Sequence, residues 1–322
     1  MLLANREKNK DFQLKTRNRQ LRTVMVTGIS GMLGVELYKA LKDEYKIIGL
    51  DVRNFPLTEH FPLYNIDITN WAKFSALSSQ PLVGNQIDLI IHTAAYTDVD
   101  GCEKNPDLAY KVNALGTRNL VLFAQERNIP LMYISTDFVF NGKKRSPYLE
   151  FDEPCPLNIY GRSKLAGEKY VSSFLDRFFI VRTAWLYGRY GKNFVKTILK
   201  LAREKSELKV VDDQVGSPTY AKDLAQGIKE LLYGAPYGIY HLTNSGICSW
   251  YDFARKILEL AGINIKIKPI TSGQLDRPAK RPSFSVLENF CLKETLGFSM
   301  RSWQKALKEY IQETGDKICL QS

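Results

Sequence analysis

Long apolar runs are missing from the sequence. None approaches the roughly 18 residues that a membrane-spanning helix needs, so membrane insertion is not expected. The opening stretch, MLLANREKNKDF, lacks the apolar core of a secretory signal. Internal repeats and low-complexity tracts are also absent. With 44% hydrophobic and 25% charged residues, the composition is that of a globular protein and excludes collagen, coiled coil and wholesale disorder.

Cysteine is scarce. The five residues are scattered, odd in number and without a CxxC pair, which argues against a disulfide framework. We therefore expect free, buried thiols in a reducing compartment, the cytoplasm, and no metal-ligating residues in the site. The cysteines are Cys102, Cys155, Cys248, Cys291 and Cys319.

Positive charge exceeds negative charge: 45 Lys and Arg residues face 34 Asp and Glu residues, a net charge of +11. Residues 1–22 hold seven basic and two acidic side chains, so +5 stands in a segment with few apolar residues. We expect a flexible, solvated tail there. The other +6 is spread over the remaining 300 residues and suits anionic small molecules as well as DNA.

Short apolar runs alternate with helical stretches after the tail, which is typical of βαβ units. The expected strands are 23–27, 47–51, 87–92, 131–135 and 179–182, and the expected helices are 31–41, 107–127 and 164–172. This pattern predicts an α/β fold, a Rossmann-type doubly wound parallel sheet over 23–184 that binds a dinucleotide.

Beyond about residue 185 the rhythm changes to helices separated by short strands and proline-bearing loops. We expect a smaller C-terminal α/β substrate lobe over 185–322, closing over the carboxyl edge of the sheet, with some segments returning to the Rossmann domain. Its expected helices are 193–204, 220–233, 249–261 and 301–312.

A glycine-rich loop, TGISGMLG at 27–34, joins the first strand to the first helix. Its spacing, TGxxGxxG, lets backbone amides approach a pyrophosphate at the helix N-terminus. The pattern is weak by itself, but a buried strand before it and a helix after it favour dinucleotide binding. The predicted cofactor-binding residues of this loop are Gly28, Ser30, Gly31, Met32, Leu33 and Gly34.

The choice of cofactor stays open between NADH and NADPH. Asp51 ends the second strand, where a carboxylate can bind the adenosine ribose and would repel a 2′-phosphate. Arg53 could instead bind that phosphate. Asp67 lies where it could bind the adenine amine, or it could cap a helix.

Tyr160 and Lys164 form a YxxxK pair one helical turn apart. As chemistry, Tyr160 would protonate a carbonyl oxygen, while Lys164 would lower the pKa of that tyrosine and hold the nicotinamide ribose. A hydroxyl from Ser135-Thr136, at the end of a strand, could bind the same oxygen. A second YxxxK pair, Tyr38 and Lys42, lies inside the first helix and is not expected to be catalytic.

These features together resemble the extended short-chain dehydrogenase/reductase family, and further stretches resemble its dTDP-4-dehydrorhamnose reductase branch. The resemblance runs in order over about residues 23–300. The matching stretches are AAYTDVDGCE (94–103), STDFVFNG (135–142), PLNIYGRSKLAGE (156–168), RTAWLYG (182–188), GKNFVKT (191–197), DDQVGSPTYAKDLA (212–225), GIYHLTNSGICSWYDFA (238–254) and RPSFSVL (281–287).

The resemblance implies a catalytic triad of Thr136, Tyr160 and Lys164, with Thr136 preferred over Ser135. It adds Ile68, Ala94, Ala95 and Tyr96 to the cofactor site. It implies a substrate site of Thr97, Val99, Asp137, Phe138, Trp185, Asn193, Asp213, Gln214 and Arg281. Arg281 could pair with a diphosphate, whereas Trp185 could instead be core between the lobes and Asp213 could cap a loop.

The resemblance further implies NAD(P)H-dependent reduction of the C4 ketone of dTDP-4-dehydro-L-rhamnose. Phe138 stands where the branch commonly has tyrosine, so another 4-keto nucleotide sugar stays open as substrate. A cofactor-binding regulatory subunit resembling the methionine adenosyltransferase β subunit is the second hypothesis. Mg²⁺ and a homodimer are compatible with the resemblance. Binding of nucleic acid through the tail is not expected, since no aromatic residues are interleaved with its charges.

Overall fold

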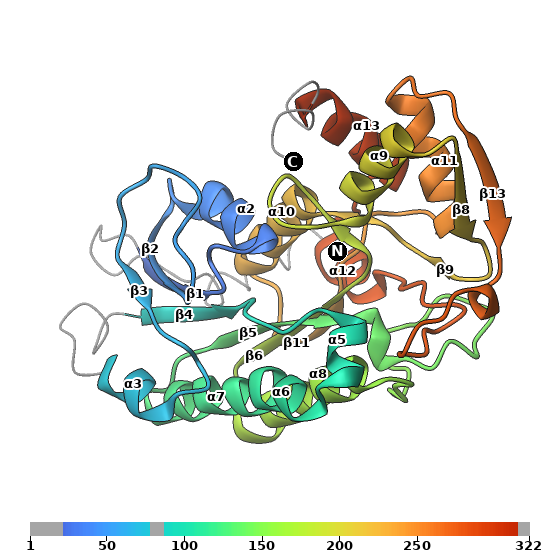
Figure 1. Ribbon diagram of the computed structural model, residues 1–322. Coiled ribbons are helices and arrows are strands. Elements are labelled where there is room, and N and C mark those ends of the chain that lie inside the picture. Colours follow the sequence, from blue (N-terminus) through green and yellow to red (C-terminus); the bar gives the residue numbers. More distant parts are fainter. Residues whose placement is uncertain (1–21, 78–86, 315–322) are drawn as a thin grey trace.

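The computed structural model describes residues 22–77 and 87–314; the predicted tail, apart from Arg22, and Cys319 lie outside this part of the chain. In these ranges seven parallel strands form the central sheet, in the order β11-β6-β5-β4-β1-β2-β3 (Figure 1). The order reverses between β1 and β4, so the sheet is doubly wound and the predicted Rossmann-type α/β fold is confirmed. The strands are β1 (Arg22–Thr27), β2 (Tyr45–Asp51), β3 (Leu63–Asn65), β4 (Ile87–His92), β5 (Leu131–Thr136), β6 (Phe178–Thr183) and β11 (Gly238–His241).

Helices cover both faces of the sheet. Figure 1 shows α2 (Met32–Leu41) and α10 (Ala221–Leu232) on one face, and α3 (Trp71–Ala76), α7 (Thr117–Glu126) and α8 (Ile159–Phe174) on the other. Each face has its own apolar core, which is why strands such as β1 are apolar on both sides. The helix expected over 107–127 is α6 (Pro106–Tyr110), a π-helical turn η3 (Lys111–Gly116) and α7.

The C-terminal lobe has a third core beyond the carboxyl edge of the sheet, as Figure 1 shows. Aromatic rings dominate this core: Tyr187, Tyr220, Phe253 and Tyr310 pack at centroid distances of 5.4 to 5.5 Å. The lobe contains α9 (Phe194–Glu204), α11 (Trp250–Leu260), α13 (Trp303–Thr314) and the strand pairs β7 (Leu186–Tyr187) with β10 (Thr219–Tyr220), β8 (Glu207–Val211) with β13 (Lys266–Ile270), and β9 (Val215–Gly216) with β12 (Cys248–Ser249).

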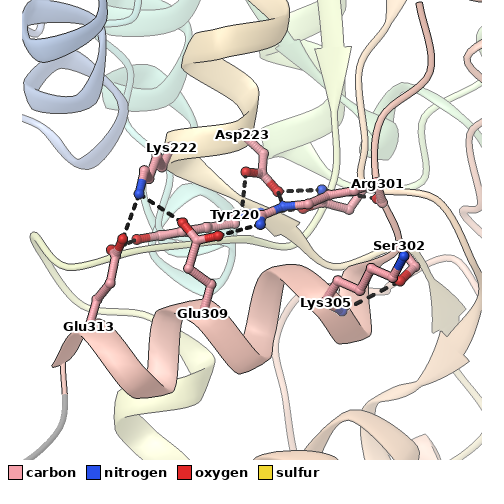
Figure 2. A network of polar contacts seen from close by, with 9 residues as sticks. Tyr220, Lys222, Asp223, Arg301, Ser302, Lys305, Glu309 and Glu313 are labelled. Carbon is pink, nitrogen blue, oxygen red and sulfur yellow. Dashed lines mark hydrogen bonds and ion pairs between the residues drawn. The ribbon is translucent and has the colours of Figure 1, made fainter.

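A network of ion pairs joins α10 of the sheet to α13 of the lobe (Figure 2). Arg301 holds both carboxylate oxygens of Asp223, at 2.7 and 2.8 Å, and also pairs with Glu309. Lys222 bridges Glu309 at 2.7 Å and Glu313 at 2.5 Å. Because the acids and bases alternate, every carboxylate here is matched by a cation, and the network couples the lobe to the sheet.

The described cysteines are free thiols, in agreement with the absence of a disulfide framework. Cys102 and Cys248 are buried as expected, and burial raises the pKa of the Cys102 thiol to about 12. The expectation is wrong for Cys155, which is exposed in the loop before α8, and Cys291 is only half-buried. None of the helices in the described ranges is long and apolar enough to cross a membrane.

Candidate active site

Three predicted residues meet where β5 ends and α8 begins. Thr136 is the last residue of β5, and Tyr160 and Lys164 lie one turn apart at the start of α8. The Thr136 hydroxyl donates to the Asp137 carboxylate at 3.0 Å and lies near enough to the Tyr160 hydroxyl to act on its pKa. Lys164 is buried, and its Nζ donates to the carbonyl oxygen of Ile134 at 2.7 Å. The structure therefore brings the three side chains together at the carboxyl edge of the sheet.

The start of α8 explains why Tyr160 lies close to the end of β5. The helix begins at Ile159 rather than at 164 as expected, because the Asn158 side chain caps it and accepts from the Gly161 N–H at 2.8 Å. Gly161 lies against the loop after β5: a Cβ there would be 2.1 Å from the carbonyl oxygen of Phe138. The glycine of the YGRSK stretch thus allows the helix to approach the strand end, and Tyr160 approaches with it.

Burial shifts the titration of all three ionisable groups around the triad. It raises the pKa of Tyr160, with Thr136 working against the rise, so the expected lowering of this pKa by Lys164 is not seen. It lowers the pKa of Lys164 to about 7, with Glu168 acting in the opposite direction. It raises the pKa of Asp137 to about 7, offset in part by the hydroxyls of Ser285 and Thr136. Tyr160 therefore carries its proton at neutral pH, as a proton donor must.

The second YxxxK pair is structural. Tyr38 and Lys42 both bond Glu59, at 3.1 and 2.9 Å, and the Tyr38 ring stacks on Phe61. This placement agrees with the prediction that Tyr38 and Lys42 are not catalytic, because both polar groups already have a partner.

The glycine loop between β1 and α2 has the conformation that a pyrophosphate site requires. Gly28 has φ +69°, and a Cβ on it would be 2.6 Å from the backbone nitrogen of Ala94. A Cβ on Gly34 would be 2.3 Å from the carbonyl oxygen of Gly28. Gly31 is the N-cap residue of α2, and no side chain caps this end. The cradle and the N-terminal helix dipole thus fit the dinucleotide expected here; Met32 begins α2 and Leu33 is buried beneath the loop.

Asp51 is committed to the loop itself. Its carboxylate accepts from the Ser30 N–H at 3.0 Å and from the Arg53 N–H at 2.9 Å, and the side chain is buried. The Arg53 side chain is 63% exposed and also reaches Asp51 at 3.3 Å. Asp51 therefore fixes the positions of Ser30 and Arg53, while the guanidinium of Arg53 remains largely in solvent, free to meet an added anion.

The other predicted cofactor residues lie along the same edge. Asp67 is exposed and accepts from the Thr69 N–H at 2.8 Å; the alternative that it caps a helix is wrong, because Asn70 caps α3. Ile68 is buried in the core under α3. Ala94, Ala95 and Tyr96 follow β4 and are half-buried, Thr97 is exposed, and Val99 begins α5 (Val99–Lys104).

Asn113 is a site residue that the sequence reasoning missed. It is buried in the π-helical turn η3, and its amide exchanges hydrogen bonds with the backbone of Tyr96, at 2.8 and 3.0 Å. The same amide donates to Ser163, which lies next to Lys164 on α8, at 3.0 Å. It thereby ties the cofactor-side loop after β4 to the catalytic helix. Only the spatial meeting of three segments reveals this, since no sequence motif surrounds Asn113.

Several predicted substrate residues are engaged within the C-terminal lobe. Trp185, at φ +48°, stacks on Trp250 with ring centroids 3.5 Å apart. Asn193 caps α9 and donates to the carbonyl oxygen of Gly188 at 2.7 Å.

Two further residues predicted for substrate bind the turn η5 (Ser272–Gln274) that follows β13. Asp213 accepts from the N–H and the hydroxyl of Ser272, at 2.9 and 2.6 Å. Gln214 donates to the same hydroxyl at 2.7 Å. These contacts are those of a capped loop, the alternative left open for Asp213.

Arg281 forms a two-pronged ion pair with Asp100 on α5, at 2.8 and 3.1 Å. Burial works to raise the pKa of Asp100, but the hydrogen bonds from Arg281 and the Ala279 N–H outweigh it and hold that pKa below its usual range. Arg281 also lines a cavity of about 530 Å³ together with three further cations, Lys143, Lys144 and Arg145. So many cations around one cavity suit an anionic ligand. The KKR run at 143–145 is the sequence signal that could have predicted this cavity, and the sequence reasoning missed it.

Metal binding finds no support in the described part of the chain. No three His, Cys, Asp or Glu side chains gather there in a way that could hold an ion.

The model of one protein family, the RmlD substrate binding domain, matches residues 22–315. The chain belongs to this family. Among its relatives is the spore coat polysaccharide biosynthesis protein SpsK of Bacillus subtilis (strain 168), 42% identical over 90% of this chain and 97% of that protein. The dTDP-4-dehydrorhamnose reductase of Aggregatibacter actinomycetemcomitans is 37% identical over 88% of this chain and 97% of that protein.

Solved structures agree with this membership of the RmlD family. The dTDP-4-dehydrorhamnose reductase of Bacillus anthracis str. Ames, in complex with NADP, superposes with a TM-score of 0.84 at 40% identity. That similarity covers 92% of this chain and all of the other. The resemblance found in the sequence to the extended short-chain dehydrogenase/reductase family is thus confirmed.

Proposed function

We propose that this RmlD-family protein is an NADPH-dependent reductase of a dTDP-linked 4-keto sugar, acting on dTDP-4-dehydro-L-rhamnose to form dTDP-L-rhamnose. The observation that carries the proposal is the meeting of Thr136, Tyr160 and Lys164 at the sheet edge that also bears the glycine loop. In an open α/β sheet this edge is where ligands bind. The relatives named dTDP-4-dehydrorhamnose reductase, one of them with NADP bound, support the same activity.

Each residue of the triad has a defined task in this reaction. Bound NADPH supplies the hydride that adds to the C4 carbonyl carbon of the sugar. Tyr160 gives its hydroxyl proton to the carbonyl oxygen, so that the ketone becomes an alcohol. Thr136 hydrogen-bonds that oxygen and lies near the Tyr160 hydroxyl. Lys164, while protonated, stabilises the tyrosinate that the transfer leaves behind and holds the nicotinamide ribose.

The diphosphate of the substrate is proposed to bind at Arg281. The guanidinium is planar and already oriented by Asp100, which suits two-pronged contact with a phosphate. The cations at 143–145 in the adjoining cavity add positive potential. The roles inferred for Asp137, Phe138 and Trp185 in the sugar pocket rest on the family resemblance, and Asn193, Asp213 and Gln214 are proposed to shape its wall.

NADPH is the proposed cofactor because the Asp51 carboxylate is already bonded to two backbone N–H groups, whereas Arg53 is exposed beside Ser30. Replacing Arg53 by Ala should raise the KM for NADPH about tenfold, the equivalent of one charge-assisted hydrogen bond, and leave that for NADH unchanged. Steady-state kinetics with both cofactors measure this. Lys46→Ala, which removes an exposed cation from β2, is the matched control and should change neither value. Equal losses with both cofactors would contradict the role of Arg53.

The decisive experiment measures NADPH oxidation by the purified protein with dTDP-4-dehydro-L-rhamnose, beside other dTDP-4-keto hexoses. The proposal expects turnover with the rhamnose precursor and a lower kcat/KM with the other sugars. Higher kcat/KM with another 4-keto sugar would keep the reductase and replace its substrate. Tight NADPH binding without reduction of any of them would overturn the proposed function and favour a cofactor-binding regulatory subunit.

A further inference from the structure

A buried ion pair lies directly behind the triad. Arg182 on β6 donates to both oxygens of Glu168 on α8, at 3.0 and 2.7 Å, and the two side chains are 2% and 5% exposed. Ser135, at the end of β5, donates to the same carboxylate at 2.5 Å. Glu168 thus joins one helix to two neighbouring strands. Such a pair is costly to bury, and removing one partner leaves the other as an uncompensated buried charge.

The pair also decides between the two hydroxyls that end β5. The Ser135 hydroxyl donates a hydrogen bond to Glu168, so Ser135 belongs to the network of the ion pair. Thr136, the next residue, ends the strand and lies by Tyr160, near the start of the same helix. The preference for Thr136 as the catalytic hydroxyl therefore has a structural reason.

Glu168 follows Lys164 by one turn of α8, as Lys164 follows Tyr160, so the three side chains lie along one face of the helix. Lys164 is buried with its Nζ on the carbonyl oxygen of Ile134 and 4.0 Å from the centre of the Tyr133 ring. A carbonyl and a ring face stabilise an ammonium only in part. Glu168 is the carboxylate whose charge acts on Lys164.

We propose that Glu168, held in place by Arg182 and Ser135, is a positioning residue that favours the protonated form of Lys164 and so sets the alkaline limit of the reductase. The part of this inference that concerns the reductase rests on the proposed function. Arg182 prevents the carboxylate from swinging onto Lys164, which leaves the ammonium free to act on Tyr160 and the cofactor. The negative charge of Glu168 nevertheless reaches Lys164 through a dry interior, where charges interact strongly.

The other titratable groups around Lys164 do not supply this charge. His92, on β4, is buried between the hydroxyls of Thr27 and Thr117, and burial, aided by the charge of Lys164, keeps its pKa well below the ordinary value. Tyr133, on β5, is buried, and its pKa is raised by that burial. Both are therefore neutral near pH 7. Asp137, after β5, acts on Tyr160.

The test compares the wild type with Glu168→Gln, which keeps the shape and removes the charge, and with Glu168→Asp, which keeps the charge. Two measurements follow pH from 5.5 to 9: kcat/KM for the sugar, and the NMR shift of the Lys164 ε-carbon in ¹³C-lysine protein, assigned by its loss in Lys164→Met. We expect the alkaline midpoint of both to fall by about one pH unit in Glu168→Gln and to stay near the wild-type value in Glu168→Asp.

Unchanged midpoints in Glu168→Gln would overturn the inference, because a purely structural role lowers rates without moving a titration. Should Arg182, left unpaired, prevent that variant from folding, the double variant Glu168→Gln, Arg182→Gln removes both charges and should show a downward shift that is smaller, because the unpaired cation is gone as well. A wild-type midpoint in the double variant would count equally against it. The NMR titration needs no turnover, so a protein that fails to reduce the sugar still decides the role of Glu168.

Discussion

Replacing Tyr160 by Phe is expected to lower kcat by about 10²–10⁴-fold, the range that a positioned general acid contributes. The phenol lies near the Thr136 hydroxyl, and its raised pKa keeps the proton in place until the carbonyl oxygen needs it. Phe has the same ring and fills the same space beside Phe138, whose ring centroid is 5.9 Å away. The change therefore removes the transferable proton and little else.

The measurement is single-turnover reduction of the sugar with saturating NADPH. NADPH affinity, followed by fluorescence titration, should remain within about threefold of the wild-type value, a change below 1 kcal/mol. Tyr38→Phe is the matched control, because it removes a tyrosine hydroxyl from the other YxxxK pair and should leave kcat unchanged. A Tyr160→Phe protein that turns over at the wild-type rate would remove Tyr160 from the mechanism.

Replacing Gly161 by Ala is expected to lower kcat by about 100-fold while the protein still binds NADPH. The new Cβ would be 2.1 Å from the carbonyl oxygen of Phe138, so α8 and the loop after β5 must separate. Tyr160 and Thr136 lie on opposite sides of that contact, and a misplacement of about 1 Å between catalytic groups can cost about 100-fold in rate. Alanine should favour the helix by about 1 kcal/mol, but the overpacking costs about 1–3 kcal/mol.

Chemical denaturation and single-turnover kinetics measure the two effects of Gly161→Ala separately. Gly273→Ala is the control: no atom lies within 4 Å of a Cβ there, and stability and rate should both be retained. The glycine loop holding the cofactor is part of a different contact, between β1 and α2, which explains why NADPH affinity should survive. A Gly161→Ala protein of full activity would show that the start of α8 does not position Tyr160.

The alternation of apolar strands and helices was sufficient to predict the doubly wound sheet, because buried parallel strands must be apolar on both faces. The same strands carry the site: β1 leads into the glycine loop and β5 ends at Thr136. Local patterns could not predict how the lobe residues are used. Trp185 meets Trp250 across 65 positions of sequence, and Asp213 meets Ser272 across 59. Those contacts depend on how the elements of the lobe pack, which no periodicity records.

By itself the sequence determined the fold class and the phosphate loop, which follow from short-range spacing, and through the family resemblance it offered Thr136, Tyr160 and Lys164 as the triad. Tertiary structure decided the remaining questions. It bonded the Asp51 carboxylate to the N–H groups of Ser30 and Arg53 and left the Arg53 side chain 63% exposed. It also placed the Ser135 hydroxyl against Glu168 and the Thr136 hydroxyl near Tyr160. Ser135 and Thr136 are neighbours in sequence, and only the packing of α8 against the end of β5 determines which of its side chains each hydroxyl meets.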